Sequence, residues 1–377
     1  MRTQVLFAAW LAVGLTVAGC GGGSGGDDGG GGGDDGGGGD DGGGGDDDDD
    51  DMPGDGPYFP PGSFYYEDVS DATPVENSDA ITAFMEDLYG PNGWGTGEMR
   101  IDFSIATNRA AAGTAKVAFE IIDDYYYEGE CDLAPNPLPA GGVVEVNWES
   151  PPDLSGDLTG YECVGFEDGA DCHLIVFAPD EDRLYEIYHA TVTSDGTLYG
   201  GCQAVWDTSQ PPPPGGRGQQ CTSADAAGYA IAPLLITPDE IANDALHHAV
   251  RLILPNDMIR GGTYHPPATH GTDSTGPADS LPYGGRMRLR ADYPIADLSP
   301  SAQIIARAMQ TYGMLLADGG NLAITAESDV LYDNKWEDLG IDSFSLADLR
   351  ASDFDVIIAG DPIVTGGSEC DHVPLTE

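Results

Sequence analysis

The stretch Arg183-Leu-Tyr-Glu-Ile-Tyr-His-Ala-Thr-Val-Thr193, continued through Ser194-Asp195-Gly196 into Thr197-Leu-Tyr-Gly-Gly-Cys-Gln-Ala-Val-Trp206, indicates a β fold. Both halves are rich in β-branched and aromatic residues, which strands favour. The Ser-Asp-Gly step between them predicts a turn that joins two strands into a hairpin.

Working outward, similar patterns predict further strands. They are Met99–Ile105, Ala115–Ile122, Gly142–Trp148, His173–Ala178, Leu246–Leu254, Gly285–Ala291, Asn321–Ala326 and Phe354–Ala359. Few helices are expected: one from Ser78 or Asp79 to Leu88, one around Asp225–Ala227, and one opened by Ser299-Pro300 and stopped by Gly313. We therefore expect a β-dominated α+β fold, with an antiparallel β-sandwich or jelly-roll-like core and a few packed helices.

The N-terminus predicts export. Arg2 precedes an apolar run, Val5 to Ala18, that is too short for a permanent membrane span and is typical of a signal peptide, residues 1–19. The end of this run, Val17-Ala18-Gly19-Cys20, resembles the lipobox of bacterial lipoproteins. The resemblance implies cleavage before Cys20 and lipid on its thiol. Because Gly21 and not Asp follows Cys20, the lipobox resemblance implies an outer-membrane destination.

Residues 20–56 are expected to form a disordered tether, since after Cys20 they are almost entirely Gly and Asp. We expect calcium to associate at most loosely with the tether, because its Asp pairs lack the spacing of a closed calcium-binding loop. Without Arg2 and the 13 aspartates of the tether, the chain still has 52 acidic and 13 basic residues, a net charge of −39. Nucleic-acid binding is excluded on this ground.

Residues 57–377 are expected to form a single globular ectodomain, with a surface loop or sub-domain break at 210–218. Six cysteines remain beside Cys20, an even set that predicts disulfides in an oxidising compartment. They are Cys131, Cys163, Cys172, Cys202, Cys221 and Cys370. Sequence separation alone favours Cys163 with Cys172, Cys202 with Cys221, and Cys131 with Cys370. The absence of any C-x-x-C spacing disfavours the rival interpretation, a zinc site.

No catalytic signature occurs in the globular part, so candidate site residues follow from strand alternation. His248 lies on the face of Leu246, Val250 and Leu252, which makes it either a core histidine bonded to a carbonyl or an acid/base group in a pocket. Glu186 lies on an apolar face, where a carboxylate is paired or has a raised pKa.

Three arginines, Arg286, Arg288 and Arg290, alternate with apolar residues along one predicted strand. Guanidinium groups bind carboxylates and sulfates in a bidentate manner, so this row predicts either an anionic ligand site or internal pairing with the protein's own carboxylates. His270 lies in a neighbouring loop as a further ligand-binding candidate. Its spacing from His265 does not indicate a metal pair, and we expect no metal and no cofactor.

Several segments resemble a family of uncharacterised secreted bacterial proteins. They are Leu184–Ile187, Thr222–Gly228, His248–Arg251, Met287–Ala291 and Tyr312–Asp318. These segments span about 130 residues and add weight to positions on or beside them, but they imply no activity. The positions are Glu186, His248, His270, Arg288, Arg290 and Asp318. The resemblance breaks at Gly319-Gly320-Asn321-Leu322, where the family pattern has Asn-Gly and an aromatic residue.

Together these features predict a lipid-anchored surface or periplasmic protein whose ectodomain binds or cleaves an extracellular, possibly anionic, polysaccharide. If it is a hydrolase, Glu186 and Asp318 form the expected acid/base pair, because glycoside hydrolysis needs two carboxylates about 5–10 Å apart. The alternative is a non-catalytic envelope or adhesion protein. The sequence does not fix the oligomeric state.

Overall fold

A computed structural model describes residues 58–122, 129–146, 152, 154–156, 158–213 and 215–377. The described residues belong to one compact unit, which includes the segments on both sides of 210–218. The predicted signal peptide, Cys20 and the tether lie outside the described residues. No helix in the described part of the chain has the length and hydrophobicity of a membrane-spanning segment.

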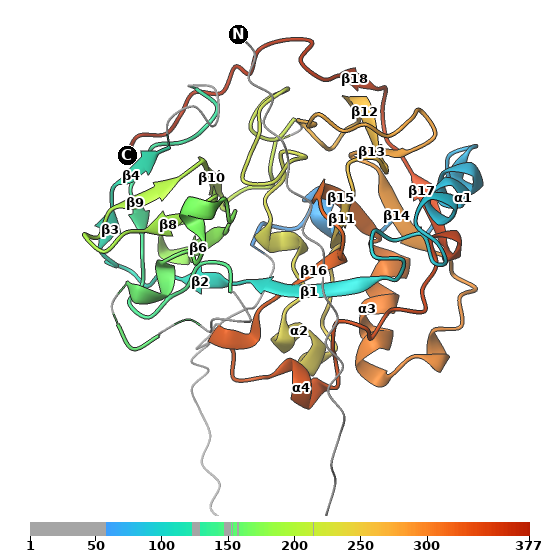
Figure 1. The fold of residues 1–377 in the computed structure, drawn as a ribbon, viewed down its shortest axis with the longest axis horizontal. Coiled ribbons are helices and arrows are strands. Elements are labelled where there is room, and N and C mark those ends of the chain that lie inside the picture. Colours follow the sequence, from blue (N-terminus) through green and yellow to red (C-terminus); the bar gives the residue numbers. More distant parts are fainter. Residues whose placement is uncertain (1–57, 123–128, 147–151, 153, 157, 214) are drawn as a thin grey trace, which may run out of the picture. The chain divides into compact units, whose positions relative to one another are not determined.

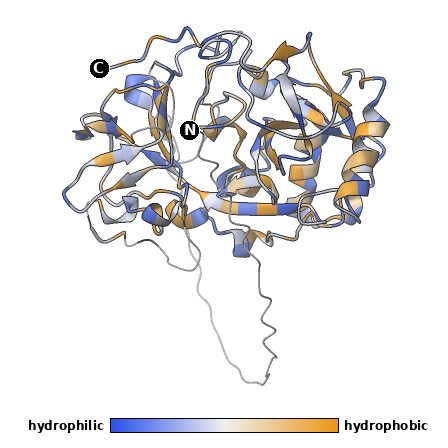
Figure 2. Ribbon diagram, turned by 45° about the horizontal axis from the view of Figure 1, so that its top comes forward, coloured by the Kyte–Doolittle hydropathy of each residue, from blue (hydrophilic) through white to orange (hydrophobic). Residues whose placement is uncertain are grey.

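The largest sheet has six strands (Figure 1). In spatial order they are β1 (Arg100–Ile105), β16 (Ala323–Glu327), β11 (Val250–Leu254), β15 (Met314–Gly319), β14 (Arg286–Leu289) and β17 (Phe354–Ile357). β1 pairs with β16 in parallel, as β11 does with β15, and the other neighbours are antiparallel. Figure 2 shows hydrophilic and hydrophobic residues alternating along β1.

A second sheet of four strands follows directly where β1 leads into β2 (Figure 1). Its strands are β10 (Cys202–Asp207), β7 (Arg183–Tyr188), β6 (Leu174–Ala178) and β2 (Thr107–Arg109). The remaining described strands form three small sheets. One contains β4 (Phe119–Ile121), β9 (Leu198–Gly200) and β8 (Thr191–Val192), and another contains β13 (Leu281–Tyr283), β12 (Ile259–Tyr264) and β18 (Ile363–Val364). The third pairs β3 (Lys116–Val117) with β5 (Asn136–Pro137). One hydrophobic core packs between the six-stranded sheet and one face of the four-stranded sheet, and a second core covers the other face of the four-stranded sheet.

The expected β-dominated α+β class with few helices is confirmed. The pairing inside the main sheets differs from the antiparallel core expected from sequence, because both larger sheets contain parallel neighbours. Strand patterns of hydrophobicity record burial, and they carry little information on the direction of the neighbouring strand.

The helices are α1 (Ser78–Leu88), α2 (Pro238–Asn243), α3 (Pro300–Thr311) and α4 (Trp336–Leu339). Two of the three predicted helices are confirmed, α1 and α3, and in α3 the Ser299 side chain accepts a hydrogen bond from Ala302 N. The third, around Asp225–Ala227, is wrong. There Ser223 Oγ accepts a hydrogen bond from Asp225 N at 2.9 Å and closes a turn instead of capping a helix.

The hairpin at Ser194-Asp195-Gly196 is confirmed between β8 and β9. The predicted strand Leu246–Leu254 is shorter than expected and begins at Val250. The predicted strand at Gly142–Trp148 is wrong in its described part, up to Val146. That part is an irregular connection in which Glu145 N donates to His173 O and Val146 N to Ser104 O, so it crosses between β6 and β1.

Three disulfides are present: Cys131–Cys202, Cys163–Cys172 and Cys221–Cys370. Only the Cys163–Cys172 pairing agrees with the sequence expectation, and the pairings Cys202–Cys221 and Cys131–Cys370 are wrong. Sequence separation could not find the correct partners, because they are brought together by tertiary contacts across 71 and 149 residues.

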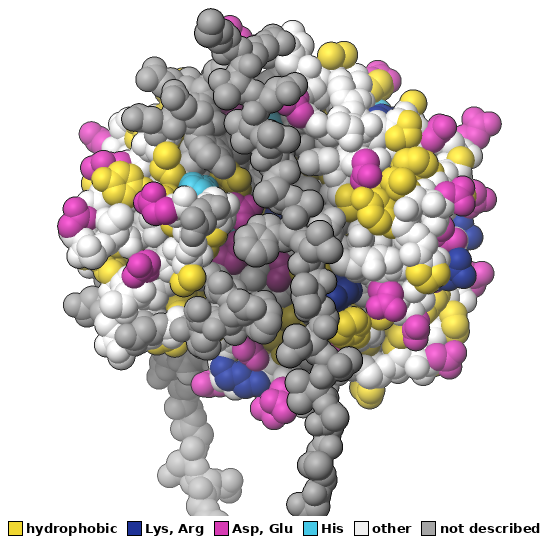
Figure 3. Space-filling view, in the orientation of Figure 1, with side chains coloured by type: hydrophobic (Ala, Val, Ile, Leu, Met, Phe, Trp, Pro, Cys, Tyr) yellow, Lys and Arg dark blue, Asp and Glu magenta, His cyan; other side chains and the backbone are white. Residues whose placement is uncertain are grey.

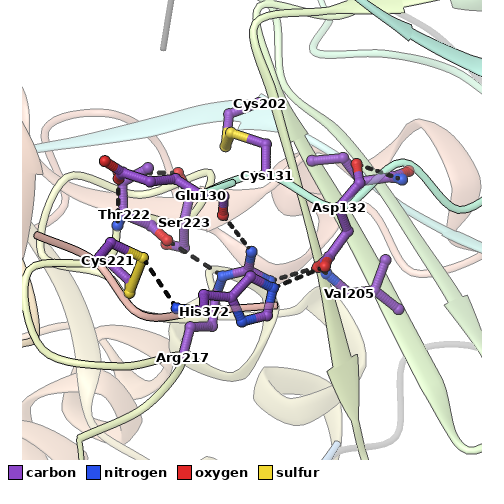
Figure 4. Close-up of a disulfide and its surroundings, with 12 residues drawn as sticks. Glu130, Cys131, Asp132, Cys202, Val205, Arg217, Cys221, Thr222, Ser223 and His372 are labelled. Carbon is purple, nitrogen blue, oxygen red and sulfur yellow. Dashed lines mark hydrogen bonds and ion pairs between the residues drawn. A yellow bond between two sulfur atoms is a disulfide. The ribbon is translucent and has the colours of Figure 1, made fainter. Parts of the chain in front are cut away.

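Asp132 holds the 210–218 loop through its hydrogen bond with Arg217 (Figure 4). This buried carboxylate accepts hydrogen bonds from Arg217 in that loop at 2.5 Å and from Val205 N in β10 at 2.8 Å. It also accepts bonds from His372 and Leu375 N near the C-terminus, each at 2.8 Å. One carboxylate therefore joins the loop, the four-stranded sheet and the C-terminal segment.

Candidate functional site

A row of polar side chains crosses one face of the six-stranded sheet. Asp102 of β1 pairs in register with Thr325 of β16, and Arg251 of β11 donates to Thr325 Oγ1 at 3.0 Å. Residues opposite one another in neighbouring strands share a face. The other face of the same strands is apolar, with Ile101 and Leu252 both registered against Ile324.

Arg251 joins two carboxylates at this polar face. Its Nη2 lies 2.8 Å from Asp225 Oδ1 and 2.9 Å from Asp318 Oδ2, and its Nε donates to Asp225 Oδ2. The Arg251 and Asp225 side chains are 4% and 0% exposed, whereas Asp318 is 26% exposed. The row is therefore closed on the Asp225 side and open at Asp318.

A second pair of carboxylates meets at Ser104. Ser104 Oγ lies 3.0 Å from Asp102 Oδ2 and 2.8 Å from Glu145 Oε1. A hydroxyl has a single proton to donate, so both contacts are hydrogen bonds only when one carboxyl group is protonated. Burial, followed by the Glu145 charge, raises the pKa of Asp102, so Asp102 takes up a proton more readily than Glu145 does.

Glu145 is held ionised by His173 at the start of β6. His173 donates to Glu145 Oε2 from Nδ1 at 2.8 Å and from its backbone N at 3.0 Å. Burial opposes both charges, but this pairing outweighs it, lowering the pKa of Glu145 to about 2 and raising that of His173 to about 9. His173 Nε2 is buried and has no hydrogen-bond partner among the described residues.

We call these charged residues the ionic cluster; its members are Asp102, Glu145, His173, Asp225, Arg251 and Asp318. Burial, followed by the Asp225 charge, raises the pKa of Asp318 to about 7, although Arg251 lowers it in part. The cluster therefore combines Asp318, whose pKa lies near neutral pH, with Glu145, which stays ionised. No group of three or more His, Cys, Asp or Glu side chains in the described part of the chain could hold a metal ion.

Of the three predicted catalytic residues, only Asp318 belongs to this cluster. Glu186 lies in β7 with no exposed surface and accepts hydrogen bonds from Ile231 N, Ala232 N and Trp206 Nε1 at 2.7, 2.9 and 3.0 Å. Burial raises the pKa of Glu186 to about 7, as expected for a carboxylate on an apolar face. Its contacts are those of a structural core group.

His248 has both ring nitrogens engaged. Nδ1 lies 2.7 Å from Ala249 O and Nε2 lies 3.1 Å from Glu240 Oε1. Burial would lower the pKa of His248, but the Glu240 charge and hydrogen bond raise it above its ordinary value. The bond to the Ala249 carbonyl matches the core interpretation of His248, but His248 also lines a cavity, so the pocket interpretation keeps its support.

The predicted ligand-binding residues are also paired within the chain. Arg286 donates to Phe64 O at 2.8 Å, Arg288 binds Asp355 at 2.8 Å, and Arg290 lies within 3.1 Å of Asp355 and 2.7 Å of Asp79. These contacts correspond to internal pairing. His270 Nδ1 lies 2.8 Å from the carbonyl oxygen of Ala226, the residue that follows Asp225 of the ionic cluster.

Sequence reasoning missed five members of the ionic cluster. Strand alternation puts Arg251 on the face opposite His248, which would make it solvent-facing, but β11 is buried on both faces. Asp102 alternates with Ile101 and Phe103 and so resembles an ordinary solvent-facing residue. Only the tertiary structure shows that Asp225, Arg251 and His173 are buried while Asp102, Glu145 and Asp318 stay partly exposed.

Searches of protein families, of curated proteins and of solved structures find no match to this chain. The arguments for function therefore rest on the chemistry of the site.

Proposed function

We propose that the ectodomain hydrolyses an extracellular polysaccharide, with Asp102 and Glu145 as its carboxyl pair. The observation that carries this proposal is the shared contact with Ser104 Oγ, at 3.0 and 2.8 Å. It keeps the bonded oxygens within about 6 Å, and retaining glycosidases place their carboxyl groups about 5–5.5 Å apart.

The raised pKa of Asp102 and the low pKa of Glu145, about 2, give the two groups different roles. Asp102 donates its proton to the glycosidic oxygen as the bond from that oxygen to the anomeric carbon breaks. The ionised Glu145 stabilises the positive charge that develops on the anomeric carbon. Water then adds to that carbon and returns a proton to Asp102.

His173 acts as a positioning residue in this proposal, because its hydrogen bond orients Glu145 and keeps it ionised. Asp318, with a pKa of about 7 and a partly exposed side chain, is a second candidate acid beside Arg251. The pairing of Arg286, Arg288 and Arg290 inside the chain supports a neutral glycan over an anionic one.

The test is release of reducing ends from a panel of neutral, amino and uronic-acid polysaccharides. We expect Asp102→Asn and Glu145→Gln each to lower turnover about 100-fold or more, the usual effect of removing an acid/base group. Glu120→Gln, which changes an exposed carboxylate on β4, is the matched control and should keep the parent rate. Parent-like hydrolysis by both Asp102→Asn and Glu145→Gln would overturn the assignment.

A second candidate function is a non-catalytic envelope or adhesion protein. The observation that favours it is the complete internal engagement of Glu186 and His248. Under this alternative the parent protein releases no reducing ends from any glycan in the panel, although it is fully folded.

We further propose that the protein is lipid-anchored through Cys20 at the outer membrane, on the basis of the lipobox resemblance. Cys20→Ser should abolish palmitate labelling and move the protein to the soluble fraction, because stable anchoring takes about two acyl chains. Membrane retention of the variant that only detergent reverses would contradict the proposal.

A further inference from the structure

A cavity of about 380 Å³ lies at the opposite end of β11 from Asp318. Its walls come from the segment that begins the described chain, from α2, and from the residue that follows α3. Tyr58, Tyr66 and Tyr312 contribute aromatic rings, and Glu240 and His248 line it as well. We call this cavity the tyrosine pocket. Its volume is within the range of small-molecule sites, about 300–1,000 Å³.

The charged pair in the tyrosine pocket is fixed in place. Glu240 Oε2 accepts hydrogen bonds from Thr237 N and Oγ1, which form the capping box of α2, and Glu240 Oε1 lies 3.1 Å from His248 Nε2. Because His248 Nδ1 is bonded to Ala249 O, His248 has no free N–H to offer an anion. The two charges compensate each other locally.

A further carboxylate lies behind one aromatic wall. The Tyr58 hydroxyl donates to Glu327 Oε1 at 3.3 Å, and Tyr332 donates to Glu327 Oε2 at 2.7 Å. Burial raises the pKa of Glu327 to about 6, so the group is mostly ionised at neutral pH. A hydroxyl that donates to a carboxylate leaves its ring richer in electrons, which strengthens the negative potential on the ring face.

The wider surroundings of the tyrosine pocket are also negatively charged. No described Lys or Arg lines the tyrosine pocket. The whole chain has a net charge of −51, and acidic side chains outnumber basic ones on the face drawn in Figure 3. A negative field attracts cations and repels anions before either reaches the cavity.

We propose that the tyrosine pocket binds a small organic cation through an alkylammonium group. Tyrosine faces attract such cations, and the attraction grows when the cation is removed from water, as it is in a cavity of this kind. The aliphatic part of the ligand would pack on the proline and leucine side chains that share the walls. This proposal stands on the cavity and its charges and does not depend on the hydrolysis proposed for the ionic cluster.

The experiment compares choline with 3,3-dimethyl-1-butanol, which has the same shape and no charge, by calorimetry on the full protein. We expect choline to bind and the neutral alcohol to bind at least ten-fold more weakly. Equal affinities would show an apolar cavity without cation selectivity and would overturn the proposal. Absence of choline binding at millimolar concentration would do the same.

Variants then assign the binding to the pocket. Tyr66→Leu and Tyr312→Leu should each weaken choline binding about 5- to 30-fold, whereas Tyr66→Phe keeps the ring and should stay within about three-fold of the parent. Tyr293→Leu, a half-buried tyrosine outside the cavity, is the matched control. Melting curves establish that each variant is folded. Unchanged choline binding in folded Tyr66→Leu and Tyr312→Leu would place the cation elsewhere and refute the assignment.

Discussion

The buried carboxyl group of Glu186 should make the stability of this protein depend on pH. Glu186 has no exposed surface, and burial raises its pKa from 4.5 to about 7. Since the folded pKa is above the unfolded one, the native state binds the proton more tightly. The resulting stabilisation is fully present below pH 4.5 and is lost as pH rises through 7. At about 1.4 kcal/mol per pKa unit, the loss is on the order of 3 kcal/mol.

Glu186→Gln removes this titration and retains most of the shape. The amide oxygen can accept the bonds from Ile231 N and Ala232 N, but the amide NH₂ then faces the N–H of Trp206. Two opposed donors should cost about 1–3 kcal/mol at every pH. We therefore expect a variant that is less stable at pH 5, and whose free energy of unfolding falls by about 3 kcal/mol less than that of the parent between pH 5 and pH 8.

Guanidinium unfolding at pH 5, 6, 7 and 8, with the disulfides intact, measures this difference. Glu120→Gln removes an exposed carboxylate and should leave the pH dependence of the parent unchanged. A Glu186→Gln variant with the full pH dependence of the parent would refute the reasoning. An equal reduction in Glu120→Gln would attribute the effect to net charge and not to burial.

Two further changes test the packing. Arg288→Ala removes the hydrogen bonds to three backbone carbonyls and to Asp355, which keeps only its pair with Arg290. This change should lower the free energy of unfolding by about 2–4 kcal/mol, while Arg288→Lys, which keeps the charge, should lose less; a loss under about 1 kcal/mol in the alanine variant contradicts this role. Replacing Cys221 and Cys370 by Ala should destabilise the protein by about 2–3 kcal/mol more than replacing Cys163 and Cys172, because the first disulfide closes a loop of 149 residues and the second a loop of 9. Denaturant unfolding measures both losses, and the reverse ranking contradicts the dependence on loop length.

Features set by local chemistry could be predicted from the sequence. The helix α3 begins where Ser299 caps it and Pro300 supplies a helical φ, and the chain leaves it at Gly313, which has a φ of 71°. The hairpin between β8 and β9 likewise follows from the Ser194-Asp195-Gly196 turn, in which Gly196 has a φ of 86°. These signals act over a few residues and need no tertiary partner.

Features that depend on distant partners could not be predicted. Glu145 lies in a connection without regular structure, and only its hydrogen bonds to His173 and Ser104 bring it to the ionic cluster. Arg251 was missed for a different reason. Alternation assigns residues to the two faces of a strand, but it does not reveal that both faces are buried. Of the ionic cluster, the sequence singled out Asp318 alone as a candidate catalytic residue.

The distribution of charge limits what this protein can recognise. Arginines are scarce in the chain, and Arg217, Arg251 and Arg288 are each buried against an aspartate of the protein itself. A guanidinium engaged in this way is not free for a sulfate or a uronic acid without leaving a buried carboxylate unpaired, which costs several kcal/mol, about 3–5. The two proposed sites instead use carboxyl groups and tyrosine rings. Such groups suit hydroxyl-rich neutral glycans and organic cations, and the two proposed sites follow from that same imbalance of charge.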